Sequence, residues 1–423
     1  MQGFTRNMIK INTHTLENGL RLVHSEDRST QMVALNILYD VGARDEDENH
    51  TGFAHLFEHL MFGGSLHIPS YDDPLQLAGG ESNAWTNNDI TNYYLTVPRQ
   101  NVETGFWLES DRMLSLDFTT RALEVQRQVV MEEFKQRNLN QPYGDLSHLL
   151  RPLAYQIHPY RWPTIGKELS HIANATLWEV ESFYNRFYAP NNAILAVTGN
   201  ISFETTLRLT EKWFASIPRR EVKPRALPAE PLQKAERRLT VERPVPIDAL
   251  FMAFHTSARM HPDFYAFDIV SDVLSNGRSS RFMQHLVNER KIFTSIDAYI
   301  SGSIDPGLFQ ISGKVAENIS LEEAEETVWE ELRILKEELV GEEELTKVKN
   351  KFEANEIFGN MNYLNLATNL AFFELMGRAE LINDEVSHYQ NVTATQLQSI
   401  VRRAFDRSNC SVIHYRAKQS DIQ

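Results

Sequence analysis

Cysteine is almost absent from this chain: one occurs in 423 residues. A single cysteine cannot form an internal disulfide, and Cys410 is expected in the core of a C-terminal strand. No apolar run approaches the length of a membrane span, and residues 1–10 lack the apolar segment of a signal peptide. We therefore expect a soluble, cytoplasmic protein for the chain as given, or a periplasmic one if its N-terminus was processed.

Positive charge is also scarce. Lys and Arg number 42 against 57 Asp and Glu, which gives a net charge of −15. This balance argues against a nucleic-acid-binding protein and provides no basic patch for a membrane surface. An acidic, solvated surface is the simplest interpretation, although acidity lining a chamber would favour basic peptides.

Proline is infrequent except at one place near the middle of the chain. Four of the 16 prolines lie within Ser216–Pro231, among charged residues of both signs. Such a stretch is typical of an extended linker. With 42% hydrophobic residues, the chain can support two cores of about 200 residues each. We predict an N-terminal domain over 1–217, a linker over 218–234 and a C-terminal domain over 235–423.

The two halves resemble each other. A predicted helix over 175–187 precedes an apolar strand over 191–197, and a helix over 393–405 precedes a strand over 409–415, at an offset of 218. Each half opens with an alternating strand, at 32–39 and 248–254. Further helices are predicted at about 263–275, 321–339, 342–358 and 363–377. This pattern indicates an α+β fold in which each half is a mostly antiparallel sheet backed by helices.

The strongest chemical signal is His55-Leu-Phe-Glu58-His59. Residues four apart lie on one face of an α-helix, so His55 and His59 can bind the same ion. Zinc accepts imidazole nitrogen, and catalytic zinc sites use three protein ligands with water in the fourth position. Glu58 can serve as the general base that takes the proton of that water. Two histidines on a packed helix face are the competing interpretation, but the apolar flanking residues favour a rigid site.

A third ligand should come from another segment. The run 121–137 lacks Gly and Pro and reads as a helix, and it offers Glu124, Glu132 and Glu133. Glu133 follows Val129 and Val130 by four and three residues, whereas the neighbours of Glu132 are polar. Helical geometry favours Glu133 over Glu132 as the third ligand only weakly, because any Glu on such a helix can belong to a solvated face.

The chain resembles the pitrilysin/insulinase family of zinc metallopeptidases, in its half-length, bacterial-type form. The likeness is carried by the inverted zinc motif and its continuation to Ser65, by Gly79-Gly-Glu-Ser-Asn83-Ala84-Trp85-Thr86, and by the segments 108–113, 129–133 and 188–192. The resemblance implies that His55, His59 and Glu133 bind one Zn²⁺ per chain and that Glu58 is the catalytic base. It also implies two homologous domains that form half of a clam-shell. Gln126 stands where some members have a second Glu.

The same resemblance concerns the substrate. Residues Asn83, Ala84, Trp85 and Thr86 alternate like a strand and correspond to the family's substrate-binding edge. A peptide could pair with such an edge through backbone hydrogen bonds. From the residues alone an ordinary strand is equally compatible with the pattern.

One element of the family pattern is missing. Members have an Arg and, seven residues later, a Tyr that hold the substrate carbonyl, but this chain has Val287 and Thr294 at those positions. Arg290 is three residues out of register. We therefore expect the chain to pair with a homologous metal-free subunit that supplies Arg and Tyr, or else to form a homodimer.

These features together predict a zinc metalloendopeptidase that hydrolyses peptides or small unfolded polypeptides in an enclosed chamber, as the catalytic subunit of a heterodimer. The alternative is a non-catalytic or weakly active scaffold subunit of a larger complex. A metal-binding transporter or chaperone component is a third possibility. The presence of both histidines, Glu58 and Glu133 favours the enzyme.

Overall fold

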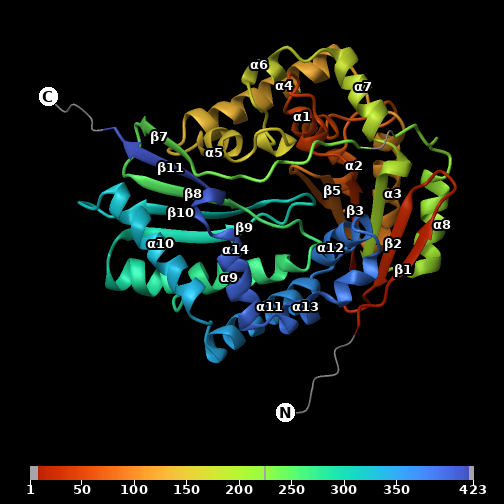
Figure 1. The fold of residues 1–423 in the computed structure, drawn as a ribbon. Helices are drawn as coiled ribbons and strands as arrows, with labels where there is room; N and C mark the ends of the chain where they lie inside the picture. The colour runs from red at the N-terminus through yellow and green to blue at the C-terminus, as the bar shows by residue number, and fades with distance from the viewer. Residues whose placement is uncertain (1–7, 223–224, 419–423) are drawn as a thin grey trace. The chain divides into compact units, whose positions relative to one another are not determined.

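The computed structural model describes residues 8–222 and 225–418 (Figure 1). Residues 1–7, examined above for a signal peptide, and 223–224 of the predicted linker lie outside the described residues. The chain forms two compact units that interleave along the sequence: unit 1 contains 1–135, 162–227 and 356–385, and unit 2 contains 136–161, 228–355 and 386–423. The predicted domains describe the two similar halves of the sequence and stay a prediction. The two compact units differ from these halves, because each unit includes a segment from the other half of the chain.

Unit 1 contains a six-stranded sheet in the order β1-β2-β6-β3-β5-β4, in which only β2 and β6 run parallel. Its strands are β1 Asn12–Thr15, β2 Arg21–Glu26, β3 Met32–Tyr39, β4 Glu81–Thr86, β5 Thr91–Pro98 and β6 Ala193–Gly199. Its helices are α1 Phe53–Leu60, α2 Asp72–Leu77, α3 Val102–Leu114, α4 Thr120–Phe134, α6 Leu169–Ala173, α7 Leu177–Phe187, α8 Phe203–Phe214 and α12 Tyr363–Leu375.

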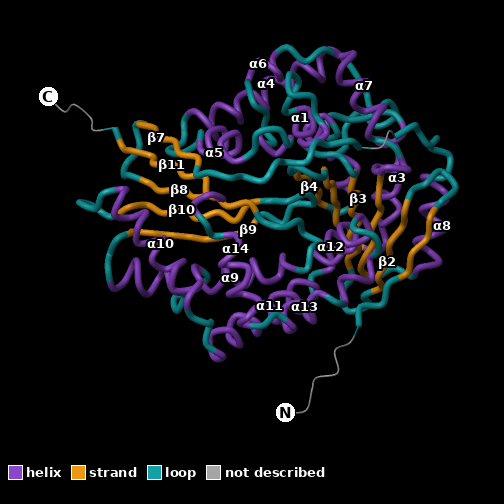
Figure 2. Tube along the Cα trace, in the orientation of Figure 1, coloured by secondary structure: helices purple, strands orange, loops and turns teal. Residues whose placement is uncertain are grey.

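Unit 2 contains a five-stranded sheet in the order β7-β11-β8-β10-β9, in which only β7 and β11 run parallel. Its strands are β7 Arg237–Arg243, β8 Ala249–His255, β9 Phe293–Ile300, β10 Leu308–Val315 and β11 Cys410–Ala417. Its helices are α5 Leu146–Ala154, α9 Asp263–Ser275, α10 Leu321–Glu337 and α14 Ala394–Ala404, while α11 Glu342–Asn360 and α13 Glu385–Asn391 contain unit boundaries. Figure 2 shows α9, α10 and α14 along one face of this sheet and α5 along the other.

Apart from the additional edge strand β1, the first sheet has the same strand order and directions as the second, which confirms the predicted α+β fold with two related halves. In each copy a capping box begins the helix before the last strand, at Thr176 and Thr393, and an Asn side chain donates to the carbonyl five residues earlier, at Asn192 and Asn409. These equivalent residues are 217 positions apart, so the predicted offset of 218 is wrong by one. The doublet Asn191-Asn192 caused the error, because the sequence alone does not say which Asn corresponds to Asn409.

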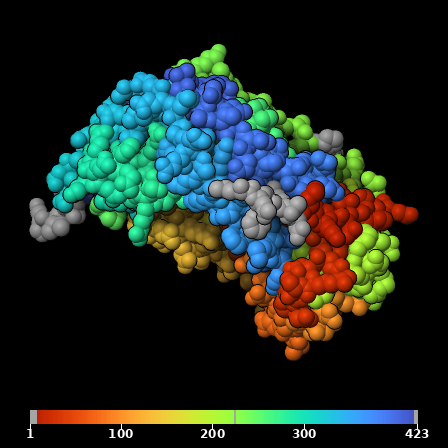
Figure 3. Space-filling view, turned by 90° about the horizontal axis from the view of Figure 1, so that it is seen from below, coloured from red at the N-terminus to blue at the C-terminus, as the bar shows by residue number. Residues whose placement is uncertain are grey.

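Both faces of the first sheet are covered at its centre, and this explains why the central strand β3 is apolar and almost wholly buried. One face packs on the main core, to which Leu35 and Ile37 belong. The other face is covered by α12, whose Thr368 donates to Asn36 within a buried pair of amides formed with Asn92. In the space-filling view the blue segment that contains α12 lies against the red N-terminal strands (Figure 3).

The segment 218–234, predicted to be a linker, has no helix or strand in its described residues, and polar contacts fix it at both ends. Arg225 binds Asp45 and Asp40 in unit 1, and Glu230 accepts the backbone N–H groups of residues 156–158 in unit 2. Cys410 is buried at the start of β11, as expected. Among the described residues, no helix is both long and apolar enough to cross a membrane.

Candidate metal centre

The inverted zinc motif, His55-Leu-Phe-Glu58-His59, lies on α1, and the start of this helix depends on a glycine. Gly52 is the N-cap of α1 and has a φ of 89°, a left-handed conformation that side chains disfavour. A Cβ there would lie 2.7 Å from Ile172 Cδ1 and 2.9 Å from the Ile165 carbonyl oxygen. The helix can therefore begin at Phe53, against its neighbours, only because residue 52 has no side chain.

A buried carboxyl group caps the start of this helix. Glu46 accepts the backbone N–H groups of Gly52, at 2.9 Å, and of Ala54, at 2.8 Å. These are orphan donors of the first helical turn, which need a partner outside the helix. Burial raises the pKa of Glu46 from about 4.5 to about 8, although the N–H groups of Ala54 and Gly52 act to lower it. Glu46 thus fixes the end of α1 that carries His55.

We expect Glu46 to make stability depend on pH. Its pKa in the folded protein, about 8, exceeds the ordinary value near 4.5, so folding favours the protonated carboxyl. The free energy of unfolding should therefore fall as the pH rises from about 4.5 to about 8, by up to about 1.4 kcal/mol per pH unit. Glu46→Gln keeps the shape but cannot ionise. Thermal melts of the metal-free proteins from pH 5 to 9 should show wild type losing stability relative to Glu46→Gln, and parallel profiles would contradict this role.

The middle of α1 is supported from the sheet. The Tyr93 hydroxyl on β5 donates to the Phe57 carbonyl oxygen at 3.2 Å and lies 3.0 Å from the Tyr188 hydroxyl. Tyr93 in turn packs on the guanidinium of Arg112, which is buried and held by Glu109 at 2.6 to 2.9 Å. A cation placed over an aromatic ring and paired with a carboxylate forms a rigid support. The segment 108–113 therefore holds α1 in place without adding a side chain to the group of His55, His59 and Glu133.

The helix expected to carry the third ligand is α4. Thr119 caps its first turn by accepting the Ala122 N–H group, and Arg127 donates to the carbonyl oxygens of Ala173 and Ala175. Glu132 points to solvent, with a side chain 64% exposed and paired with Lys135. Glu133 is 18% exposed and faces α1. The structure therefore brings Glu133, and not Glu132, to the histidines.

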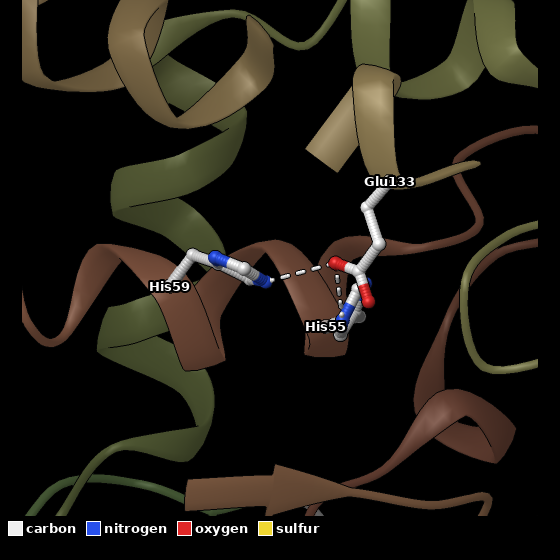
Figure 4. A group of neighbouring side chains, drawn as sticks. All are labelled: His55, His59 and Glu133. Atoms are coloured by element: carbon white, nitrogen blue, oxygen red, sulfur yellow. Dashed lines mark ion pairs between the residues drawn. The ribbon is translucent and has the colours of Figure 1, made fainter. Parts of the chain in front are cut away.

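Three side chains converge at one point. The Glu133 Oε2 atom lies 3.5 Å from His55 Nε2 and 3.3 Å from His59 Nε2. Figure 4 shows the Glu133 carboxylate pointing toward both imidazoles. One donor atom from each residue lies within 4.8 Å of the others, and among the described residues this is the only group of His, Cys, Asp or Glu side chains so arranged. The helix α9, which follows β8 as α1 follows β3, has no such group.

The donor set fits zinc. Two ligand atoms about 2.0–2.1 Å from one ion at the tetrahedral angle lie about 3.3 Å apart, and the two His–Glu separations are 3.3 and 3.5 Å. His55 is nearly buried, whereas a quarter of the His59 side chain is exposed. Two imidazoles and one carboxylate leave a fourth position for water, which is the arrangement of catalytic zinc sites.

Glu58 lies beside this group without belonging to it. It is half-buried on α1, one residue before His59. Burial raises the pKa of Tyr93 and of Tyr188, and the nearby Glu58 carboxylate raises them further. The carboxylate of Glu58 therefore lies near enough to the Tyr93 and Tyr188 phenols to act on them electrostatically.

The strand predicted to bind substrate is an edge strand. β4 contains Asn83, Ala84, Trp85 and Thr86 and pairs only with β5. The Ala84 N–H group donates to the Asn83 side chain at 2.8 Å, so this donor is satisfied within β4 itself. An edge strand presents backbone groups to which another extended chain can pair.

The positions expected to carry Arg and Tyr serve unit 2 itself. Val287 packs against the second core, in the π-helical turn Phe282–Glu289. Thr294 lies on β9 and its hydroxyl donates to the Lys314 carbonyl oxygen at 3.2 Å. Neither side chain can supply the hydrogen bonds of Arg or Tyr. Gln126, on α4, adds no carboxylate near the site.

Two family models match most of the chain. Residues 21–168 match the insulinase (peptidase family M16) model, and residues 174–352 match the peptidase M16 inactive domain. The zinc protease PqqE of Helicobacter pylori is 27% identical over 405 residues, which span 94% of this chain and 91% of that protein.

Solved structures agree with this match. The crystal structure of a protease from Helicobacter pylori superposes with a TM-score of 0.91 at 27% identity, over 97% of this chain and 100% of that one. The periplasmic protease PqqL from Escherichia coli has the same fold, with a TM-score of 0.80 at 19% identity. That match covers 97% of this chain but only 48% of PqqL.

Proposed function

The chain belongs to the insulinase family of peptidases, M16, and from this membership we propose that it is a zinc-dependent endopeptidase acting on peptides or small unfolded polypeptides. The observation that carries the proposal is the convergence of His55, His59 and Glu133 at ligand distances, with Glu58 beside them. Relatives of similar length are named zinc proteases.

The residues of this chain would have separate roles. His55, His59 and Glu133 would hold the ion, which when bound supplies a Lewis acid that activates water and polarises a carbonyl group. Glu58 would accept the proton of the attacking water and then deliver it to the leaving amine. Edge strand β4 would hold the substrate extended through main-chain hydrogen bonds. Because such bonds involve the backbone, this binding would depend little on sequence.

The missing Arg and Tyr point to a second subunit. Val287 is committed to the core of unit 2 and Thr294 to its own sheet, so the chain cannot place these donors on a substrate carbonyl. The match to only 48% of PqqL supports a protease built from two chains of this size. We propose that a homologous metal-free subunit supplies the Arg and Tyr, with a homodimer as the alternative.

Purified alone, the chain should bind about one zinc ion and hydrolyse peptides weakly. Loss of one hydrogen-bond donor to a developing oxyanion costs about 10²–10³-fold in rate, so addition of the complementary subunit should raise the rate by at least about 100-fold. Metal analysis and a fluorogenic peptide assay of the chain, the partner and their mixture measure both quantities. Full activity of the isolated chain would exclude the heterodimer while leaving the peptidase in place.

The second candidate function is a non-catalytic or weakly active scaffold subunit. Val287 and Thr294 favour it, because they remove substrate-holding groups. The presence of His55, Glu58, His59 and Glu133 opposes it, since a scaffold has no need for them. The Glu58 variant considered in the Discussion separates the two functions.

A further inference from the structure

The helix that covers the second face of the first sheet leaves one end of that face uncovered. α12 packs over β3 and β6 and reaches β2, but it makes few contacts with β5. The sheet continues beyond β5 to the edge strand β4. On this end of the face stand Trp85, from β4, and Tyr94, from β5, both half-buried.

A hollow of about 350 Å³ lies between these two rings and the side of α12. Its other lining residues are Gly359, Leu364, Asn365, Thr368 and Asn369. This volume lies within the range of about 300–1,000 Å³ that is usual for small-molecule sites. All of the lining residues belong to unit 1.

The chemistry of the lining is specific. Two aromatic rings line the side of the sheet, Leu364 together with two amides and a hydroxyl lines the side of α12, and no lining residue carries a charge. Next to Gly359, the side chains of Phe358 and Met361 are 70% and 69% exposed and add apolar surface. A charged side chain would lose its hydration here without an opposite charge. An aromatic ring with a hydrogen-bonding edge matches both walls.

The hollow adjoins the edge to which a peptide would pair. Successive side chains of a strand point to opposite faces of the sheet. Trp85 is paired with Asn92 and Asn83 with Tyr94, so the two rings are diagonal neighbours on one face, for which a separation of about 7–8 Å is usual. Trp85 and Tyr94 lie on the α12 face, and the only strand hydrogen-bonded to β4 is β5. A peptide paired with the free side of β4 would therefore place every second side chain on the face that carries the hollow.

We propose that this hollow is a side-chain binding site for an aromatic residue, with tyrosine preferred, of a peptide that pairs with β4. The ring would stack on Trp85 and Tyr94, and the phenol would hydrogen-bond to the amide of Asn365, because the Asn369 amide already donates to Asn360. The site rests on the proposed peptidase function and adds sequence selectivity to a main-chain contact that has little of its own.

Binding of short peptides tests the site without turnover. The probe is a set of fluorescent ten-residue peptides of Ala and Ser in which one Tyr is moved through the positions, and the protein is the zinc-loaded full chain carrying Glu58→Gln. At one position Tyr should tighten binding about tenfold over Ala, as measured by anisotropy. Phe at that position should bind about threefold more weakly than Tyr, because it lacks the hydroxyl.

Three variants assign the effect to the hollow. Trp85→Ala should reduce the Tyr-to-Ala ratio of affinities to about one, whereas Trp178→Ala, which removes an indole 73% exposed elsewhere in unit 1, should leave the ratio unchanged. Asn365→Leu should make Tyr and Phe equal while keeping their advantage over Ala.

Several outcomes would overturn the site. These are the absence of a Tyr effect at every position, a ratio that survives Trp85→Ala, and a zinc-loaded protein that binds none of the peptides. The peptidase proposal fails by a different result, namely hydrolysis that persists in the zinc-loaded Glu58→Gln complex. The two failures can therefore be distinguished.

Discussion

Replacing Glu58 with Gln should lower peptide hydrolysis by the complex of this chain and its partner by about 10²–10⁴-fold, the contribution usual for a positioned acid–base group. Zinc should remain bound, because the three converging donors belong to His55, His59 and Glu133 and not to Glu58. Gln preserves the size of the side chain, but its amide cannot take a proton from water at neutral pH.

The measurement pairs initial rates on a fluorogenic peptide with zinc content in the same samples. Glu132→Gln is the matched control, since that carboxylate is 64% exposed and paired with Lys135, and its rate should equal that of wild type. If the Glu58 variant retains zinc and full activity, Glu58 is not the base. Such a result would also favour the scaffold function, because the activity of the complex would then come from the other subunit.

The sequence predicted the first two donors of the site by geometry alone. A spacing of four residues places two side chains on one helix face, and α1 realises that spacing with its rings 4.9 Å apart. Glu133 was favoured over Glu132 chiefly by resemblance. The helical pattern was weak because Val130 is buried but Val129 is 45% exposed, so the apolar stripe of α4 is only one residue wide near its end.

The groups that hold α1 in place could not be predicted from the sequence. Glu46 lies in the loop before the helix, and a charged residue in a loop usually signals a solvated position. Its burial and its two backbone hydrogen bonds arise only when the loop folds over the helix end. Tyr93 reaches Phe57 from a strand 36 residues away, and hydrophobic periodicity carries no information on such pairings.

The positions of helices and strands along the sequence were predicted more accurately than the elements against which they pack. The strand at 32–39 and the helix at 263–275 were found with their predicted limits, and the helix predicted at 363–377 ends two residues earlier. The exchange of α5 and α12 between the two units was not anticipated. An apolar helix face shows that a helix is packed, but it does not say against which sheet, and the linker suggested that each half would keep its own helices.

Replacing Glu133 with Ala should weaken zinc binding by at least about 100-fold. Loss of an outer-shell partner of a metal ligand already costs about 10–100-fold, and removal of a ligand should exceed that. The Glu133 carboxylate is the contact shared by both imidazoles, at 3.5 and 3.3 Å, so without it only two donors from one helix remain. Chelator competition measures the affinity, and Glu132→Ala, one residue away on α4, should bind zinc as wild type does.

The same substitution should reduce the stabilisation that zinc confers on the folded chain. At free zinc 1,000-fold above its dissociation constant, binding adds about 4 kcal/mol to the free energy of unfolding, and a 100-fold weaker variant gains only about 1.4 kcal/mol at that concentration. Thermal melts with and without zinc should therefore show a large shift for wild type and Glu132→Ala and a small one for Glu133→Ala. Since apo Glu133→Ala serves as its own reference, a fold damaged by the substitution cannot imitate this result. Equal zinc shifts in all three proteins would mean that the acid facing the two histidines is not a ligand, and the proposed hydrolytic site would lose its third donor.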